Sequence, residues 1–215
     1  MNNVRLGAYR DGLIVSLVES RRCLDTEQIA CLLFRGMKYG MKKCRERLGK
    51  ISKANRLRRW QPDRCSPYIY YATEKRPAQI EHMKDTNWAY VWLCQRMTSS
   101  DRWLTWEAPD YGYLRPDALG VMYCKLPNEH RAWFIEMDRS DNRWDKTAKY
   151  LRLHNEREGY WWHRHIDFPS LLVVTTSAER ANRITESLAT EGMGLRFSVR
   201  LLSEIRGECL RWSRV

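Results

Sequence analysis

The stretch that decides the fold runs over residues 115–150 and reads RPDALGVMYCKLPNEHRAWFIEMDRSDNRWDKTAKY. Two segments rich in β-branched and aromatic residues, 119–124 and 131–138, flank a segment with turn chemistry, 125–129. Short apolar runs separated by turn residues are typical of paired strands. The stretch therefore predicts an antiparallel β-hairpin.

Three carboxylates belong to this hairpin. Alternate residues of a strand share a face, so Glu136 and Asp138 point the same way. Asp117 begins the partner strand, so we expect it to lie near the end where the other two sit. Like charges this close cannot all stay ionised without a cation, and carboxylate oxygens suit Mg²⁺ or Mn²⁺. Asp117, Glu136 and Asp138 are therefore candidate metal ligands, with Mg²⁺ as the candidate cofactor.

Two lysines, Lys146 and Lys149, follow on a predicted helix over residues 141–158. Near bound phosphate a lysine would orient water or stabilise negative charge. Helical periodicity alone does not settle which face of this helix meets the sheet. The candidate catalytic set is Asp117, Glu136, Lys146 and Lys149. The alternative is a structural salt-bridge network of the carboxylates with Arg115, Arg139 and Arg143.

The order of these motifs resembles the replication-relaxation family of plasmids and other mobile elements. Pro116, Asp117 and Ala118 match its PDA motif, and an apolar strand ending in Glu136, Asp138 and Arg139 matches its E-x-D-R motif. Lys149-Tyr150 is a looser match. The resemblance extends over roughly residues 10–200, and the sharp motifs cover about a third of that span.

The resemblance implies a second domain similar to the PD-(D/E)xK nuclease fold. One departure matters for activity. The nuclease signature places a lysine two residues after the strand acid, and this chain has Asp138 there. Lys146 or Lys149 would have to substitute from the helix. If neither does, the fold is kept without the cleavage chemistry.

The charge of the chain is unevenly distributed. Its net charge is +12, and residues 1–75 hold 17 Lys/Arg against 7 Asp/Glu, whereas residues 76–215 hold 21 against 19. A basic segment beside a nearly neutral remainder is typical of a module that binds a polyanion. Double-stranded DNA is therefore the expected partner of the first third, and the alternative is a solvated basic face.

The first third also has the pattern of a winged helix-turn-helix. Helical spacing in residues 11–22, an N-cap at Asp25 and a basic amphipathic helix over 37–53 predict three helices. A predicted β-hairpin over 58–71 follows them. In this fold the third helix enters the major groove. The candidate DNA-binding residues are Lys38, Lys42, Lys43, Arg45, Arg47, Lys50, Arg58 and Arg59.

Composition excludes several other classes. No segment reaches the 18 or more apolar residues of a membrane-spanning helix, and the N-terminus lacks the apolar core of a signal peptide, so cytoplasm is the expected location. The seven cysteines include no C-x-x-C pair, which favours reduced, mostly buried thiols over a disulfide framework.

Together these patterns predict an α/β (α+β) protein with a winged helix-turn-helix at residues 1–75 and a PD-(D/E)xK nuclease-like α/β sandwich at 76–215. The expected function is DNA binding in replication or relaxation of a mobile element, with Mg²⁺-dependent cleavage as one version. The alternative is a catalytically inactive accessory protein or transcriptional regulator. It would use its second domain for homodimerisation or for contact with replication or relaxation proteins.

Overall fold

The computed structural model describes residues 3–139, 144–164, 166–192 and 194–211. The chain is a mixed α/β protein that divides into two compact units. Unit 1 comprises residues 1–95 and 206–215, and unit 2 comprises residues 96–205.

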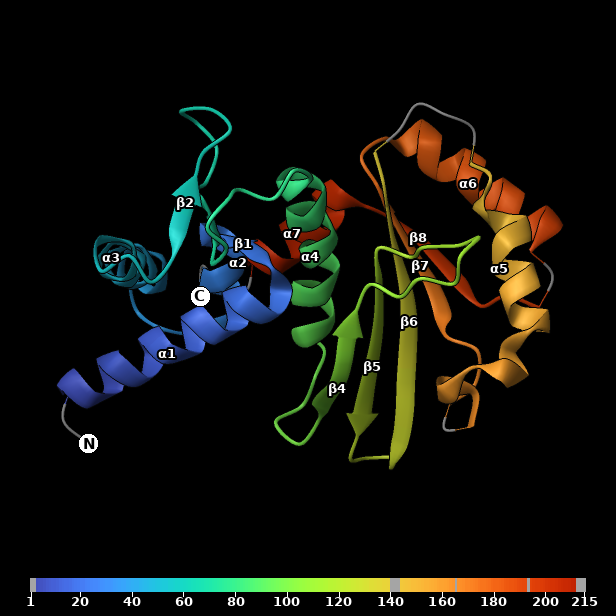
Figure 1. The fold of residues 1–215 in the computed structure, drawn as a ribbon, viewed down its shortest axis with the longest axis horizontal. Helices are drawn as coiled ribbons and strands as arrows, with labels where there is room; N and C mark the ends of the chain where they lie inside the picture. Colours follow the sequence, from blue (N-terminus) through green and yellow to red (C-terminus); the bar gives the residue numbers. More distant parts are fainter. Residues whose placement is uncertain (1–2, 140–143, 165, 193, 212–215) are drawn as a thin grey trace. The chain divides into compact units, whose positions relative to one another are not determined.

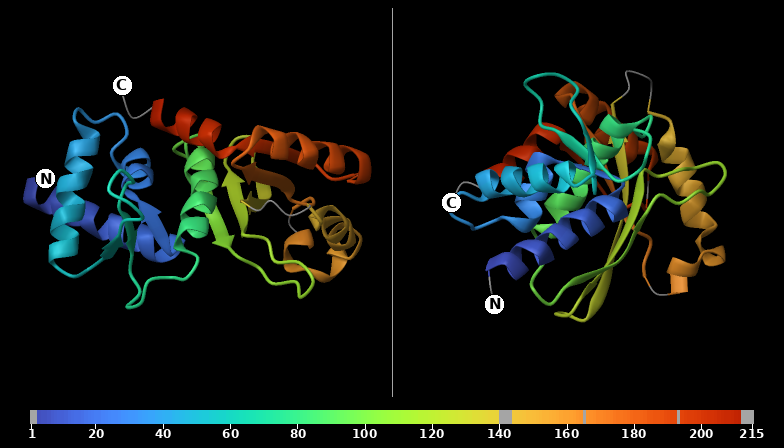
Figure 2. Two further views of the ribbon diagram at one scale, coloured as in Figure 1. Left: turned by 90° about the horizontal axis from the view of Figure 1, so that it is seen from above. Right: turned by 60° about the vertical axis from the view of Figure 1, so that its left-hand side comes forward.

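Unit 1 begins with three helices and a small sheet (Figure 1). Its strands pair antiparallel in the order β1-β3-β2. The elements are α1 (Asn3–Arg21), β1 (Cys23–Asp25), α2 (Thr26–Leu33), α3 (Gly40–Lys53), β2 (Arg58–Trp60), β3 (Ile69–Tyr71) and α4 (Ile80–Cys94). Figure 2 shows α3 crossing α1 within this unit.

Local sequence explains where these helices begin and what they bury. Asp25 caps α2 by accepting from the backbone N–H of Gln28 at 2.7 Å, and the Gln28 side chain accepts in return from the Asp25 N–H. The N-cap predicted at Asp25 is therefore confirmed, and Gln28 completes a capping box. On α3 the residues at helical spacing, Cys44, Leu48 and Ile51, are buried in the core of the unit.

The last helix, α7 (Leu202–Arg211), returns the chain to unit 1. The backbone carbonyl of Cys209 accepts from the Cys31 thiol at 3.6 Å and from the Gln95 side chain at 3.3 Å. Arg206 pairs with Glu27 at 3.0 Å. The first and last parts of the chain therefore build one core.

The described part of unit 2 holds a five-stranded sheet in the order β4-β5-β6-β7-β8. The first three strands are antiparallel neighbours, and β6, β7 and β8 run parallel. The strands are β4 (Arg102–Glu107), β5 (Ala118–Cys124), β6 (Glu129–Asp138), β7 (Ser170–Thr175) and β8 (Phe197–Leu201). Parallel neighbours need crossover connections. These crossovers contain α5 (Lys146–Asn155) and α6 (Ala178–Glu191).

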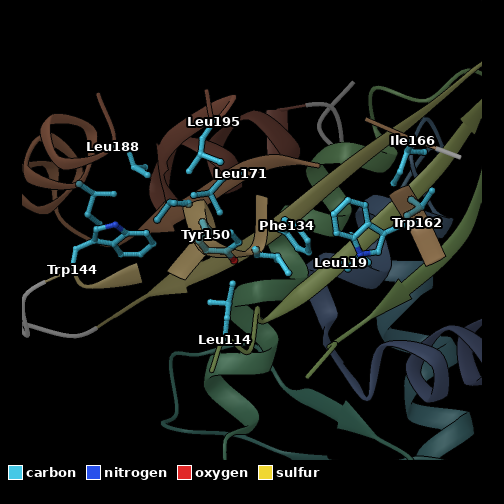
Figure 3. Packing of buried hydrophobic residues seen from close by; sticks show 14 residues of the cluster. Leu114, Leu119, Phe134, Trp144, Tyr150, Trp162, Ile166, Leu171, Leu188 and Leu195 are labelled. Carbon is cyan, nitrogen blue, oxygen red and sulfur yellow. The ribbon is translucent and has the colours of Figure 1, made fainter. Parts of the chain in front are cut away.

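Both crossover helices lie on one face of the sheet (Figure 1), and the main core of unit 2 fills the space beneath them. Figure 3 shows Phe134 of β6 and Tyr150 of α5 in this core. Trp162, in the short 3₁₀ helix Trp161–Arg164, is fully buried and its ring lies edge-on to Phe134. The aromatic run near residue 160 therefore serves to pack the α5 connection onto the sheet.

Most predicted elements are confirmed. The hairpin is present as β5 and β6 with a turn at 125–128, and the second hairpin as β2 and β3. The basic helix begins at Gly40 rather than 37, so Lys38 precedes it. Five of the seven cysteines are buried. Among the described residues no helix is both long and apolar enough to cross a membrane.

The sequence predicts a boundary between the two units at residue 75, whereas unit 1 continues through Gln95. The helix after residue 76 groups with unit 1, because α4 packs against α2 and β1. Asn87 of α4 donates its side-chain amide to the Cys23 carbonyl at 2.8 Å. The charge imbalance ends near residue 75, whereas the packed unit continues through Gln95.

Two glycines of α3 allow a matched test of this packing. A Cβ on Gly40 would lie 2.5 Å from the carbonyl oxygen of Phe34, whereas a Cβ on Gly49 would meet nothing within 4 Å. We expect Gly40→Ala to lower the free energy of unfolding by about 1–3 kcal/mol through overpacking. We expect Gly49→Ala to raise it by roughly 0.5–1 kcal/mol through helix propensity. Urea denaturation of the two variants checks this, and equal effects would contradict the described approach of α3 to Phe34.

Candidate functional site

The hairpin of unit 2 brings Asp117 and Glu136 together. Ala118 pairs with Ile135 across β5 and β6, so Asp117 lies beside the next residue of β6. One carboxylate oxygen of Asp117, Oδ2, accepts from the backbone N–H of Met137 at 2.7 Å. The expected convergence of these two acids at one end of the hairpin is therefore present.

Glu136 is almost fully buried, with 1% of its surface exposed, and both of its carboxylate oxygens have partners. Its Oε2 accepts from Lys146 Nζ at 2.5 Å, and its Oε1 accepts from the Tyr150 hydroxyl at 2.7 Å. Lys146 and Tyr150 are four residues apart on α5, so they project from the same face of the helix. The helix is thereby tied to the centre of the sheet through one side chain.

The buried position shifts the protonation of this cluster. Burial, which disfavours a charged carboxylate, raises the pKa of Glu136 from 4.5 to about 7 against the attraction of Lys146, and the charge of Asp117 adds to the rise. For Lys146, burial lowers the pKa, but the Glu136 charge and hydrogen bond outweigh it and the pKa is raised. Burial and Glu136 also raise the pKa of Tyr150 well above its ordinary value, so Tyr150 remains a hydrogen-bond donor.

The remaining two candidates of this site have partners other than Glu136. Asp138 binds Arg180 of α6 through two hydrogen bonds of 2.6 and 3.2 Å. Lys149 pairs with Asp145 on the exposed side of α5 at 2.8 Å. Of the two candidate lysines, Lys146 is thus the one that reaches the strand acid.

The sequence analysis did not predict two residues of this arrangement, Tyr150 as the hydrogen-bond partner of Glu136 and Arg180 as the partner of Asp138. Tyr150 is four residues after Lys146, and this spacing indicates that the two share a face of the helix. Arg180 is 42 residues from Asp138 in the chain, and no local sequence pattern links the two. Of the arginines in the alternative salt-bridge network, Arg115 pairs with Asp110 at 2.8 Å. Arg143 lies outside the described residues.

The donor set does not fit a metal ion as it is arranged. A divalent cation needs free carboxylate oxygens. Lys146 and Tyr150 take both oxygens of Glu136, and Arg180 takes both of Asp138. Within the described ranges, no group of three His, Cys, Asp or Glu side chains is placed to hold a metal. The positive charge that the acids need is supplied by Lys146 and Arg180.

A second candidate site is the basic surface of unit 1. Cys44, Leu48 and Ile51 occupy the inner face of α3, which leaves most of its cationic side chains in solvent. Lys38 lies in the turn before α3, and two arginines lie on β2. The exposed candidates are Lys38, Lys42, Lys43, Arg45, Lys50, Arg58 and Arg59.

Arg47 differs from the other candidates on α3. Its Nε donates to Asp11 Oδ1 at 2.6 Å, and its Nη2 pairs with the other oxygen of Asp11. Gly7 allows this guanidinium to lie against α1, because a Cβ there would be 2.9 Å from Arg47 Nη1. Arg47 therefore joins α3 to α1 within the unit and is not part of the exposed cationic surface.

An open hollow of about 660 Å³ lies between the end of α3 and the small sheet. Lys53, Arg58 and Arg59 line it together with uncharged groups that include Ser52 and Asn55. Cations and hydrogen-bonding groups around a concave surface can accommodate a phosphate chain. Lys53 extends the cationic surface beyond the candidates chosen from the sequence.

Comparison with known proteins gives no match for this chain among models of protein families, curated proteins or solved structures.

The buried Glu136 predicts a pH dependence of stability. Its native pKa of about 7 exceeds its ordinary 4.5, so the native state keeps a proton that the unfolded chain has lost. Protonated Glu136 therefore adds on the order of 1–3 kcal/mol to the free energy of unfolding. This stabilisation is complete below pH 4.5 and is lost as the pH rises through 7. Glu136→Gln removes the titrating group and with it this pH dependence.

Urea denaturation of the wild type and of Glu136→Gln between pH 4.5 and 8 measures how the free energy of unfolding of each protein changes with pH. Asp25, whose pKa burial raises to about 6, changes stability in the same direction but is common to both proteins. Parallel stability curves for the two proteins would show that Glu136 titrates normally.

Proposed function

We propose that this chain is a duplex-DNA-binding protein and that unit 1 is a winged helix-turn-helix. The observation that carries the proposal is the position of α3 in the order of elements. Three helices with one strand between the first two are followed by the antiparallel pair of β2 and β3. The third helix, α3, presents an exposed row of Lys and Arg side chains.

This arrangement supports docking of α3 into the major groove, with β2 and the loop after it against the backbone. The exposed cations at the ends of long side chains are suited to phosphate contacts, which hold a protein on DNA without reading its sequence. The clustering of these side chains on α3 and β2 favours DNA binding over the alternative of a solvated basic face.

The resemblance to the replication-relaxation family extends the proposal to a replication or relaxation role in a mobile element. Three antiparallel strands, a helix and a parallel strand form the order of unit 2 from β4 to β7. That order supports a nuclease-like core of the PD-(D/E)xK type. We propose that this core serves as an inactive accessory domain, since Lys146, Tyr150 and Arg180 occupy the carboxylates.

A second candidate function is metal-dependent cleavage of DNA at the same cluster. The observation that favours it is the ammonium group of Lys146 at Glu136, because a helix lysine thereby stands beside the strand acid. Cleavage would require Glu136 to leave both of its present partners. Binding and cleavage assays distinguish the two candidates.

Duplex binding is tested by fluorescence anisotropy at several salt concentrations. We expect Lys43→Ala and Lys50→Ala each to weaken binding and to lower the slope of log affinity against log salt by about 0.9 for each phosphate that the variant no longer neutralises. Lys125→Ala, an exposed lysine of unit 2, is the matched control and should leave the slope unchanged. Equal slopes for all three variants would contradict DNA binding through α3.

Cleavage is tested by incubating the protein with supercoiled plasmid in Mg²⁺, in Mn²⁺ and with chelator, alongside Asp117→Ala and Glu136→Ala. We expect plasmid that is retarded and uncut in every lane, because the carboxylates are already occupied. Nicking that requires both metal and both acids would establish the nuclease. Lys149→Ala is the control, since Lys149 does not reach Glu136.

A further inference from the structure

The outer side of α1 carries apolar side chains in solvent. Leu6, Tyr9 and Leu13 are 38%, 63% and 40% exposed. Their spacing of three and four residues places them on one side of the helix. Eight large hydrophobic side chains are exposed among the described residues, and three of them lie on α1. The others are Tyr39, Tyr68, Leu104, Leu126 and Trp161. Such a cluster on one helix is typical of a contact surface.

Beside this row runs a row of small residues. Ala8, Gly12, Ser16 and Ser20 follow at every fourth position, so small side chains run along one side of α1. Gly12 weakens a helix relative to alanine. Among the described residues a Cβ on Gly12 would meet no atom within 4 Å, so the packing of α1 does not require a glycine there. A glycine at this position leaves room for a second backbone to approach closely from outside.

The inner side of α1 is already occupied. Ile14 and Val18 are buried in the core of unit 1, and Asp11 binds Arg47 of α3. The guanidinium of Arg10 lies 5.2 Å from the centre of the Phe34 ring. The two outer rows are therefore a separate face of the helix.

We propose that the outer face of α1 packs antiparallel against the same face of a second copy of this chain, with Gly12 at the two-fold axis. A two-fold interface uses one patch twice. The large residues of each helix, Leu6, Tyr9 and Leu13, then lie against the row of small residues of the other. The resulting close approach is ordinary ridge-into-groove packing.

The charged residues at the two ends of this face favour a second copy of the chain as the partner, and they favour antiparallel packing of the two helices. Arg5 and Glu19 each stand seven residues from Gly12, which is about 10 Å along the axis and close to two full turns. Both are exposed, and within the described part of the chain neither forms an ion pair. Antiparallel pairing about Gly12 sets each Arg5 opposite Glu19 of the other copy, whereas parallel pairing would set like charges together. A balanced pair of charges also disfavours DNA as the occupant.

The geometry extends the proposed function. The Asp11–Arg47 pair fixes α1 to α3, so a second copy joined through α1 presents a second α3 related by two-fold symmetry. Such a dimer recognises two half-sites in inverted orientation. This extension rests on the proposed function, whereas the dimer itself does not.

The test is the mass of the full chain in solution, without DNA, by light scattering over a range of concentrations. We expect twice the 25.8 kDa of one chain. Leu13→Glu and Gly12→Leu should give monomers, with thermal unfolding of each variant showing that unit 1 is still folded. Leu126→Glu is the matched control, because Leu126 is 87% exposed and lies in unit 2, and it should remain dimeric.

Charge exchange tests the direction of pairing. Arg5→Glu and Glu19→Arg should each raise the dimer dissociation constant roughly tenfold, and the double variant should restore it. A wild-type monomer at every concentration, a dimer unaffected by Leu13→Glu, or a double variant without recovery would each overturn the proposal. A dimer that binds no DNA would retire the proposed function and leave this inference in place.

Discussion

The position of α5 on the sheet of unit 2 depends on the buried carboxylate of Glu136. A carboxylate in the interior is costly unless its charge is paired and its oxygens are hydrogen-bonded. Lys146 supplies the opposite charge and Tyr150 a hydrogen bond, from successive turns of one helix, and both act against the burial that raises the pKa of Glu136. Because β6 is an interior strand, this contact also sets where the crossover to β7 must pass. Arg180 repeats the arrangement at Asp138 and fixes the beginning of α6.

The same cluster shows how acids that form a metal-site pattern in the sequence can be paired with cations of the protein itself. Two acids on one strand and a third at the start of its neighbour satisfy the pattern of a metal site in sequence. In the structure each of the two strand acids has its own cation from a helix. Each pair brings positive charge to its acid and also holds a helix on the sheet.

The sequence predicted the parts of the fold that local chemistry controls. The alternation of residues 131–138, the turn before it and the N-cap at Asp25 each depend on neighbours within a few positions, and each is confirmed. β1 was missed because three residues show no periodicity, and α7 because its segment carries charges among its apolar positions. The boundary at residue 75 followed charge, which does not report packing.

Partners that lie far apart in the chain were beyond prediction. Arg47 has the same helical spacing and charge as its neighbours, and Asp11, which binds it, is 36 residues away. Lys146 and Lys149 are three residues apart and equally basic. Only the burial of Thr147, Tyr150 and Leu153 decides which of them turns toward the sheet. Sequence alone therefore brought Asp117 and Glu136 together, but it did not indicate which side chains pair with Glu136, Asp138 or Arg47.

The return of the chain to unit 1 through α7 makes unit 2 an insertion, with unit 1 built from two separate segments. During synthesis residues 96–205 emerge as a complete set before residues 206–211 do. Unit 1 lacks the carbonyl of Cys209 and the guanidinium of Arg206, which contact its α2, until all residues of unit 2 have been synthesised. The unit that is synthesised first is therefore the one that is completed last.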